Sequence, residues 1–325
     1  MQTRTFGRTG VAVSEIGHGT WTMGSMWGTK DDEEALRSLR HSLENGVSFI
    51  DTALVYGYGH SEKLIGQALR ETGTRPFIAT KIPPKNGQWP ARPYAAMDEV
   101  FPKDHIISST EKSLQNLGVD TIDLQQLHVW TDPWLKDKQW LKALEKLKKQ
   151  GKIRFIGVSI NDHDPNSALE VVASGLIDSV QVIYNIFDQS AEEKLFPLCQ
   201  QKNIAVIARV PFDEGSLTGT LTTTATFPTS DWRRLYFMPE RLPEICERVE
   251  KLKFLIREEI TSLPQAALKF ILSHPAVSTV IPGMRKIKHV DDCLKASDGI
   301  LLKAGELEAL KQHAWPRNFY PQYGD

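Results

Sequence analysis

Short apolar segments rich in Val and Ile alternate with amphipathic stretches along the chain. A short apolar run is typical of a buried strand, whereas apolar positions three or four residues apart indicate one face of a helix. The pattern predicts strands at residues 14–19, 48–52, 77–81, 122–128, 154–159, 179–184, 204–210 and 278–282. It predicts helices at residues 31–44, 61–71, 104–117, 135–150, 165–174, 191–202, 243–258 and 263–273.

Repeated strand–helix units predict the α/β class and a (β/α)8 TIM barrel. We expect a single domain over residues 1–325, because such barrels run to ~250 residues or more as one unit. Gly7-Arg8-Thr9-Gly10 separates two short alternating stretches, which predicts an N-terminal β-hairpin at the bottom of the barrel. The aromatic, proline-containing segment 315–325 is expected to form a C-terminal tail over the barrel mouth.

A doubly wound dinucleotide-binding sheet is the rival architecture. Gly17-His-Gly19 follows a predicted strand, as the first two glycines of that fingerprint would. The fingerprint also needs a third glycine three residues later, at the start of a helix, and Thr22 stands there. These glycines are therefore better explained as turn residues.

Charge and composition exclude several classes of protein. Lys and Arg number 39 against 40 Asp and Glu, the net charge is −1, and we expect no nucleic-acid partner. Apolar runs stay far below the ~18 residues of a membrane helix, and the N-terminus lacks the apolar core of a secretory signal. Cys199, Cys246 and Cys293 are widely spaced without a CxxC motif. We expect a cytoplasmic protein with no metal site and a small-molecule substrate.

Four candidate chemical groups lie at or just after predicted strand ends: Asp51, Tyr56, Lys81 and His128. In a barrel, the C-terminal strand ends meet at one mouth, where catalytic side chains are found. Taken singly, Asp51 could cap a turn, and Tyr56 or His128 could pack in the core. Lys81 is harder to dismiss, because a lysine closing an apolar strand requires a partner charge, and Asp51 is a candidate.

Together these groups suit hydride transfer to a carbonyl, which builds negative charge on oxygen and needs a proton donor. Tyr56 can donate the proton if the Lys81 ammonium lowers its pKa and Asp51 holds the amine. His128 can donate a hydrogen bond to the carbonyl oxygen. A lyase or isomerase with Lys81 as a Schiff base would leave Asp51 and Tyr56 unexplained.

Four ordered motifs carry a family resemblance. Phe49-Ile-Asp51-Thr-Ala53 with Tyr56-Gly57, Ile78-Ala-Thr-Lys81, residues 122–128 and residues 151–159 resemble signatures of the aldo-keto reductases. The resemblance implies that Asp51, Tyr56, Lys81 and His128 form a catalytic tetrad. It implies NADPH-dependent reduction of an aldehyde or ketone, aromatic or sugar-like, with Tyr56 as proton donor. The alternative is a nucleotide-binding regulatory subunit, as in the channel-associated members of the same family.

The resemblance also implies where a nicotinamide cofactor would bind. Arg209 stands where many relatives stack an aromatic ring, so it either stacks on the nicotinamide or pairs with a carboxylate such as Asp213. Arg285, beside Lys286 and Lys288, favours a 2′-phosphate and hence NADPH, unless the run is a solvated basic surface. The implied cofactor residues are Thr20, Trp21, Asp51, Ser159, Asn161, Gln181, Arg209, Pro211, Gly215, Leu217, Gly283, Arg285, His289 and Asp292.

Tryptophans are concentrated in segments that follow predicted strands. An aromatic mouth suits a hydrophobic or sugar-stacking cleft, because flat rings bury area and stack on flat faces. The expected substrate residues are Trp21, Trp27, Tyr56 and Trp130. The tail aromatics, including Trp315 and Tyr320, are candidates for closing the same cleft.

Overall fold

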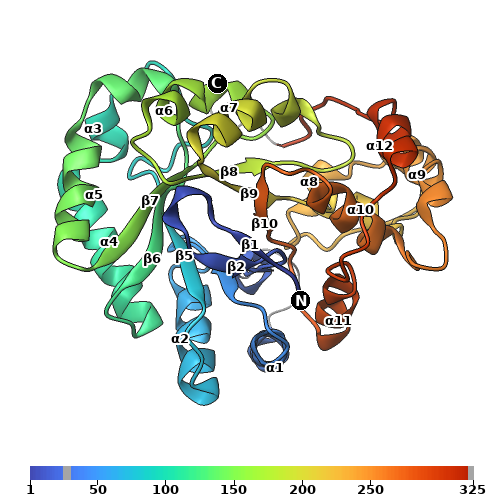
Figure 1. Ribbon diagram of the computed structural model, residues 1–325, viewed down its shortest axis with the longest axis horizontal. Helices are drawn as coiled ribbons and strands as arrows, with labels where there is room; N and C mark the ends of the chain where they lie inside the picture. Colours follow the sequence, from blue (N-terminus) through green and yellow to red (C-terminus); the bar gives the residue numbers. More distant parts are fainter. Residues whose placement is uncertain (25–30, 321–325) are drawn as a thin grey trace.

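A barrel of parallel strands surrounded by helices dominates the computed structural model, which describes residues 1–24 and 31–320 (Figure 1). Within those residues eight strands follow one another around the sheet in chain order, from β3 to β10. Backbone hydrogen bonds from Gly17 to Val280 (2.8 Å) and from Gly19 to Pro282 (3.0 Å) join the first and last strand segments. The strands are β3 (His18–Gly19), β4 (Phe49–Asp51), β5 (Phe77–Ile82), β6 (Ile122–Leu127), β7 (Ile153–Ser159), β8 (Ser179–Ile183), β9 (Ala205–Arg209) and β10 (Val277–Val280).

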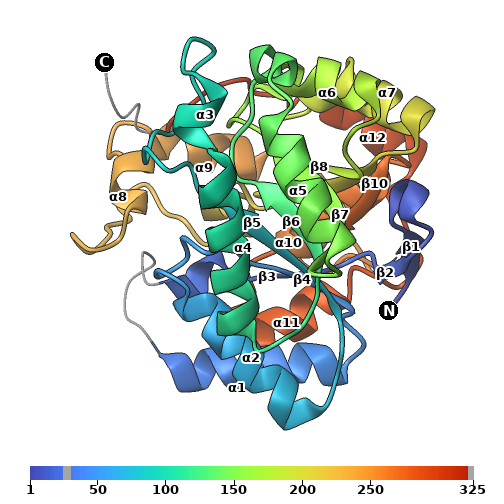
Figure 2. The same ribbon diagram turned by 90° about the vertical axis from the view of Figure 1, so that its left-hand side faces the viewer.

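Helices cover the outside of the sheet (Figures 1 and 2). The Asp31 side chain caps the first of them by accepting a hydrogen bond from the Glu34 backbone N–H, as an N-cap aspartate does. The helices are α1 (Asp32–Glu44), α2 (His60–Thr72), α3 (Met97–Val100), α4 (Lys103–Leu117), α5 (Gln139–Lys149), α6 (Leu169–Ser174), α7 (Leu195–Lys202), α8 (Arg233–Tyr236), α9 (Leu242–Glu250), α10 (Leu263–Leu272), α11 (Ile287–Leu294) and α12 (Ala304–Lys311). In the described part of the chain, each helix is too short or too polar to cross a lipid bilayer.

Four predicted helices begin or end elsewhere. Helices α6 and α7 begin at Leu169 and Leu195, not at residues 165 and 191, because short 3-10 turns precede them. Residues 132–136 form a 3-10 turn around Pro133, so α5 begins at Gln139 rather than at residue 135. Helix α9 ends at Glu250, not at residue 258, and a separate 3-10 turn at Lys253–Leu255 and a backbone bridge between Arg257 and Ile260 follow it. The predicted strand at 14–19 is also divided, since Ser14 ends the hairpin strand β2 and β3 begins only at His18.

The N-terminal hairpin closes the bottom of the barrel, as predicted. Strands β1 (Thr3–Thr5) and β2 (Ala12–Ser14) pair antiparallel. Between them, the fully buried ring of Phe6 lies 5.6 Å from that of Phe49 and 5.0 Å from that of Phe77. Since Phe49 and Phe77 are the first residues of β4 and β5, this aromatic cluster fills the end of the barrel where the strands begin.

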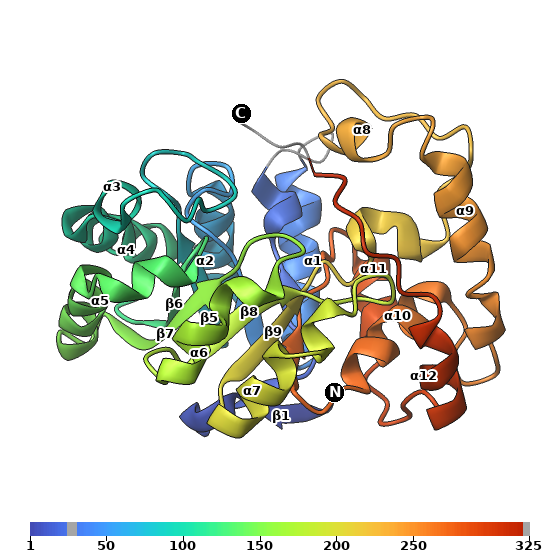
Figure 3. The same cartoon turned by 90° about the horizontal axis from the view of Figure 1, so that it is seen from above.

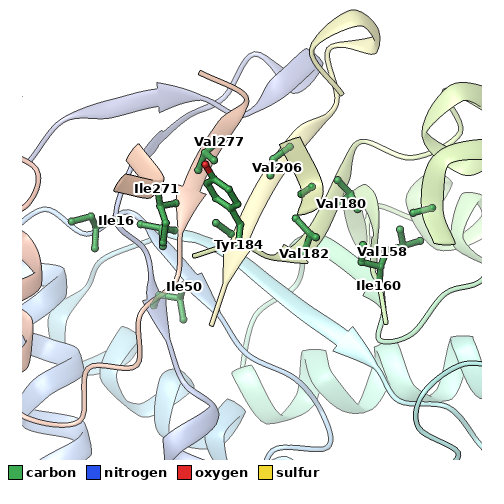
Figure 4. Close-up of a cluster of buried hydrophobic side chains, with 14 of the residues drawn as sticks. Ile16, Ile50, Val158, Ile160, Val180, Val182, Tyr184, Val206, Ile271 and Val277 are labelled. Carbon is green, nitrogen blue, oxygen red and sulfur yellow. The ribbon is translucent and has the colours of Figure 1, made fainter. Parts of the chain in front are cut away.

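A second apolar layer lies between the strands and the helices. Val158, Val180 and Val206 occupy neighbouring register positions on β7, β8 and β9 and are buried in this layer (Figure 4). Their burial on both faces of a parallel sheet explains the continuous apolar runs in the sequence. Four buried polar side chains lie in the C-terminal halves of their strands or at their middle, namely Asp51, Lys81, Ser159 and Gln181.

The C-terminal tail packs on loops that follow the late barrel strands, at the side of the molecule opposite the hairpin (Figures 2 and 3). The Trp315 backbone N–H donates to the Phe187 carbonyl at 2.8 Å. The Arg317 guanidinium pairs with Asp213, and the Tyr320 hydroxyl donates to Glu214. The described part of the tail thus lies over the mouth as expected.

Candidate active site

A buried ion pair lies at the C-terminal ends of β4 and β5. Lys81 Nζ is 2.5 Å from Asp51 Oδ1 and 2.8 Å from the Thr52 carbonyl oxygen, and both charged side chains are almost fully buried. The backbone N–H and the hydroxyl of Thr20 both donate to the Asp51 carbonyl, at 3.0 and 2.9 Å. The partner charge that Lys81 was predicted to need is therefore Asp51.

Gln181 bonds the second carboxylate oxygen of Asp51. Its Nε2 lies 2.7 Å from Asp51 Oδ2, and both side chains are buried. A carboxylate only accepts hydrogen bonds, so the amide must present its NH2 group to Asp51. The Asp51 carboxylate is thus held from two sides, by an ammonium and by an amide.

Tyr56 and His128 lie beside this pair. Lys81 Nζ is 5.2 Å from the centroid of the Tyr56 ring, and the Tyr56 and His128 rings are 5.8 Å apart, edge to face. Trp89, from the segment after β5, packs edge-on against His128 at 4.6 Å between centroids. The fold thus brings together the four residues that the sequence singles out.

Burial controls the protonation of this cluster. It raises the pKa of Tyr56 well above its ordinary 10, with the Asp51 charge acting in the same direction. The net shift is therefore opposite to the lowered pKa that we predicted. Burial also lowers the pKa of Lys81, against the opposing effect of Asp51, and burial with the nearby Lys81 charge holds the pKa of His128 well below 6.5. At neutral pH Tyr56 is a protonated phenol and His128 a neutral imidazole.

Arg209, at the end of β9, is held by the loop that follows β7. Its Nη2 donates to Asp162 Oδ1 at 2.7 Å and to the Ile160 carbonyl at 3.0 Å. The alternative of an ion pair is therefore realised, but the partner is Asp162. Asp213, the carboxylate suggested from sequence, pairs with Arg317 of the tail.

The Asn161 side chain, predicted to hold a nicotinamide, bonds the backbone of Ala91 in this structure. Its Oδ1 accepts from the Ala91 backbone N–H at 2.9 Å, and its Nδ2 donates to the Ala91 carbonyl at 3.2 Å. Both ends of the amide tie the loop after β7 to the segment after β5. Ser159, two residues earlier, is buried at the end of β7, beside Gln181 in the strand register.

Trp130 corrects the prediction of a substrate contact. The side chain is fully buried, its ring packs on those of Trp134 and Trp140, and its indole N–H donates to Asp132 at 3.1 Å. A ring enclosed in this way offers no face to a substrate. Trp27 lies outside the described residues.

Other aromatic rings do line the mouth. Trp21, after β3, contacts Trp232 at 5.3 Å, and Trp232 stacks on Tyr320 of the tail at 5.8 Å with an 8° angle between the planes. His163, after β7, lies 5.7 Å from Tyr320. We had not singled out Trp232, His163 or Asp162 as site residues, and no local motif marks them. Their one signal is their position after a barrel strand.

The loops after β9 and β10 have the features that a dinucleotide phosphate requires. Pro211 and Leu217 are buried, while Gly215 has φ +113 and Gly283 is exposed. A Cβ added at Gly215 would meet no atom nearer than 4.0 Å, and one at Gly283 none nearer than 3.4 Å. A phosphate can thus approach both backbones closely, which favours glycine.

Cationic side chains follow Gly283. Arg285 and Lys288 stand beside Lys286, which lies 3.7 Å from Glu34 of α1. On α11, His289 is exposed and Asp292 is 3.5 Å from Lys295. The donor set fits a phosphorylated cofactor. Among the described residues, no group of three or more His, Cys, Asp or Glu side chains is placed to hold a metal ion.

The chain is similar in sequence to known oxidoreductases. The chain is 32% identical over 286 residues to the aldo-keto reductase YhdN of Bacillus subtilis, covering 86% of this chain and 83% of that one. It is 28% identical to the NADH-specific methylglyoxal reductase of Escherichia coli, covering 85% and 87%.

Solved structures show the same fold. An aldo-keto reductase of Bacillus halodurans in its holo form matches with a TM-score of 0.75 and 28% identity, over 97% of this chain and 96% of that one. An aldo/keto reductase of Klebsiella pneumoniae in complex with NADP and acetate matches with a TM-score of 0.68 and 26% identity, over 98% of each chain. The model of the Aldo/keto reductase family matches residues 15–314, and the chain therefore belongs to that family.

Proposed function

We propose that the protein is an NADPH-dependent reductase that converts an aldehyde or ketone, aromatic or sugar-like, to an alcohol. The observation that carries this proposal is the buried Asp51–Lys81 pair beneath Tyr56 and beside His128. A bound nicotinamide would supply the hydride. The residues of this chain would orient the carbonyl and deliver the proton.

Tyr56 is the proton donor in this proposal. Its raised pKa keeps the phenol protonated at neutral pH, which is the state a donor needs. As negative charge develops on the carbonyl oxygen, the Lys81 ammonium beside the ring stabilises the phenolate left by proton transfer. Asp51 keeps that ammonium in place.

His128 orients the substrate. As a neutral imidazole it carries one N–H, which can donate to the same carbonyl oxygen as the Tyr56 hydroxyl. Two donors that converge on one oxygen fix the face of the carbonyl presented to the hydride. The rings of Trp21, Trp232 and Tyr320 around the mouth supply flat surfaces for an aromatic or sugar-like substrate.

Cofactor contacts are proposed for the remaining residues. Ser159 and Gln181 hold the carboxamide, Arg209 lies at the nicotinamide, and residues 211–217 cover the pyrophosphate. Gly283 and Arg285 hold the adenosine end, where the Arg285 cation favours a 2′-phosphate. The further residues proposed for the cofactor are Thr20, Trp21, His289 and Asp292.

The test follows NADPH oxidation with a panel of aldehydes, ketones and sugar carbonyls, using NADPH that carries deuterium at its transferable position. The proposal predicts that deuterium appears on the carbinol carbon of the product alcohol. NADPH binding without reduction of any carbonyl above the protein-free rate would contradict it.

A further inference from the structure

Gln181 reaches Asp51 across the inside of the barrel. Gln181 lies on β8 and Asp51 on β4, with β5, β6 and β7 between them in the sheet. Their side chains are still joined by the 2.7 Å hydrogen bond from Nε2 to Oδ2. Only inward-facing side chains can make such a contact.

This contact fixes the rotation of the Asp51 carboxylate. Lys81 Nζ bonds only Oδ1, and it is itself tethered to the Thr52 carbonyl. If the amide were removed, Oδ2 would become a buried acceptor without that partner, and the carboxylate could turn away from Lys81. An amide donor also leaves the pair's net charge at zero, which a lysine or a glutamate at residue 181 would not.

Glutamines are not bonded at every buried strand position. Gln125 on β6 is equally buried, yet neither its Oε1 nor its Nε2 has a hydrogen-bond partner among the described residues. The bond from Gln181 is therefore a specific feature of this position. Gln125, on the side of β6 that faces the helices, is a control for the loss of a buried amide from a barrel strand.

We propose that Gln181 is a positioning residue that holds the Asp51 carboxylate in the orientation that pairs with Lys81, and so keeps the Lys81 ammonium beside Tyr56. This role rests on the proposed reductase function. It is separate from a contact of the Gln181 carbonyl oxygen with the cofactor, because it uses the opposite end of the amide and acts through Asp51.

Gln181→Met removes the donor and keeps the length of the side chain. It also removes the amide oxygen proposed to hold the carboxamide, so kcat is compared at saturating NADPH and the coupling to Asp51 is measured separately by stability. Because the ammonium acts on charge that develops in the transition state, kcat at saturating NADPH should fall about 100-fold, while the KM for the carbonyl changes less than about 3-fold. Gln125→Met should leave both constants near those of the wild type. A kcat of Gln181→Met within 3-fold of the wild type, or a loss confined to KM, would overturn the role.

In the variant Gln181→Glu, the contact with Asp51 depends on pH. Two carboxyl groups in contact share a proton, so the new side chain donates to Asp51 at low pH and repels it when ionised. The ratio of variant to wild-type kcat should be at least about 10-fold higher at pH 5 than at pH 8. A ratio that does not change with pH would count against the role.

Other charged or titratable groups also act on Asp51, Lys81 and Tyr56. Comparing variant with wild type at each pH accounts for their effect. These groups are Glu62 on α2, His128 after β6, Asp162 after β7, Arg209 on β9 and Glu214 after β9.

If the wild type reduces no carbonyl, the reductase proposal is refuted but the contact between Gln181 and Asp51 is not. A stability measurement then tests that contact. Melting temperatures are compared for Asp51→Asn, Gln181→Met and the double variant. If the two side chains are coupled, the double variant should lose less than the sum of the single losses. Additive losses would refute the positioning role whether or not the protein is active.

Discussion

Lys81 shows that the residue type at a strand end can predict a buried ion pair. A lysine that closes an apolar strand must be paired, and the structure pairs it with Asp51, as the sequence predicts. The pKa of Tyr56 was predicted to fall, whereas burial and the Asp51 charge raise it. Residue types and spacing indicate which groups meet, whereas the balance between burial and charge depends on how deeply they lie.

The contacts that could not be predicted at the site involve polar and aromatic side chains with several possible neighbours. Asn161 bonds Ala91, Arg209 bonds Asp162, and Trp130 packs in the core. In each case a loop that is distant in sequence provides the partner. Spacing along the chain cannot specify which loop that is.

Arg285 gives a prediction at the residue scale. Arg285→Ala should raise the Kd for NADPH about 10- to 100-fold and leave the Kd for NADH nearly unchanged, because a charge-assisted bond to the 2′-phosphate is lost. Fluorescence titration of both cofactors measures this. Lys311→Ala on α12, which removes a surface cation paired with Glu308, is the control. Equal weakening for both cofactors would contradict the assignment.

Among secondary-structure elements, the strands were predicted best. From β4 to β10 each observed boundary falls within two residues of its prediction, because burial on both faces gives a continuous apolar run. Helices α3, α8, α11 and α12 were not predicted. Helices α3 and α8 span only 4 residues each, α11 falls in the segment assigned to cofactor contacts, and α12 buries only Leu310.

The contact between the tail and the loop after β9 predicts a pH dependence of stability. Burial raises the pKa of Glu214, which bonds Tyr320, from 4.5 to about 8, despite the opposing effect of that bond. Between pH 4.5 and pH 8, the Glu214 carboxyl is ionised in the unfolded chain but stays protonated in the folded chain. The free energy of unfolding should therefore fall as pH rises from 4.5 to 8, on the order of a few kcal/mol in total.

Glu214→Gln cannot ionise and should remove this contribution. Thermal unfolding at pH 5 and pH 8 provides the measurement, and the wild type should lose more stability across that interval than the variant. Equal losses in the two proteins would mean that Glu214 does not carry the effect.

On the scale of the whole molecule, one end of the barrel contributes to stability and the other carries the candidate active site. The hairpin and the rings of Phe6, Phe49 and Phe77 fill the end where strands begin, and the candidate catalytic groups lie where strands end. This division is general for such barrels. It explains why the architecture was predictable from the order of the elements, whereas the contacts of the mouth loops were not.

Phe6→Ala tests that separation. Removing a fully buried ring should lower the free energy of unfolding by ~3–5 kcal/mol, while kcat of the folded protein stays near the wild-type value. Denaturant unfolding and a reductase assay at low temperature measure the two quantities. Tyr94→Ala, at a ring that is 81% exposed, should change neither. A large loss of kcat in folded Phe6→Ala would show that the two ends are coupled.

The most direct test of the central claim compares wild type with Tyr56→Phe at saturating NADPH and a fixed carbonyl substrate. The variant keeps the ring beside Lys81 and loses only the proton donor. The account predicts that kcat falls about 10²- to 10⁴-fold while the Kd for NADPH is unchanged. A kcat within about 3-fold of the wild type would show that Tyr56 is not the proton donor.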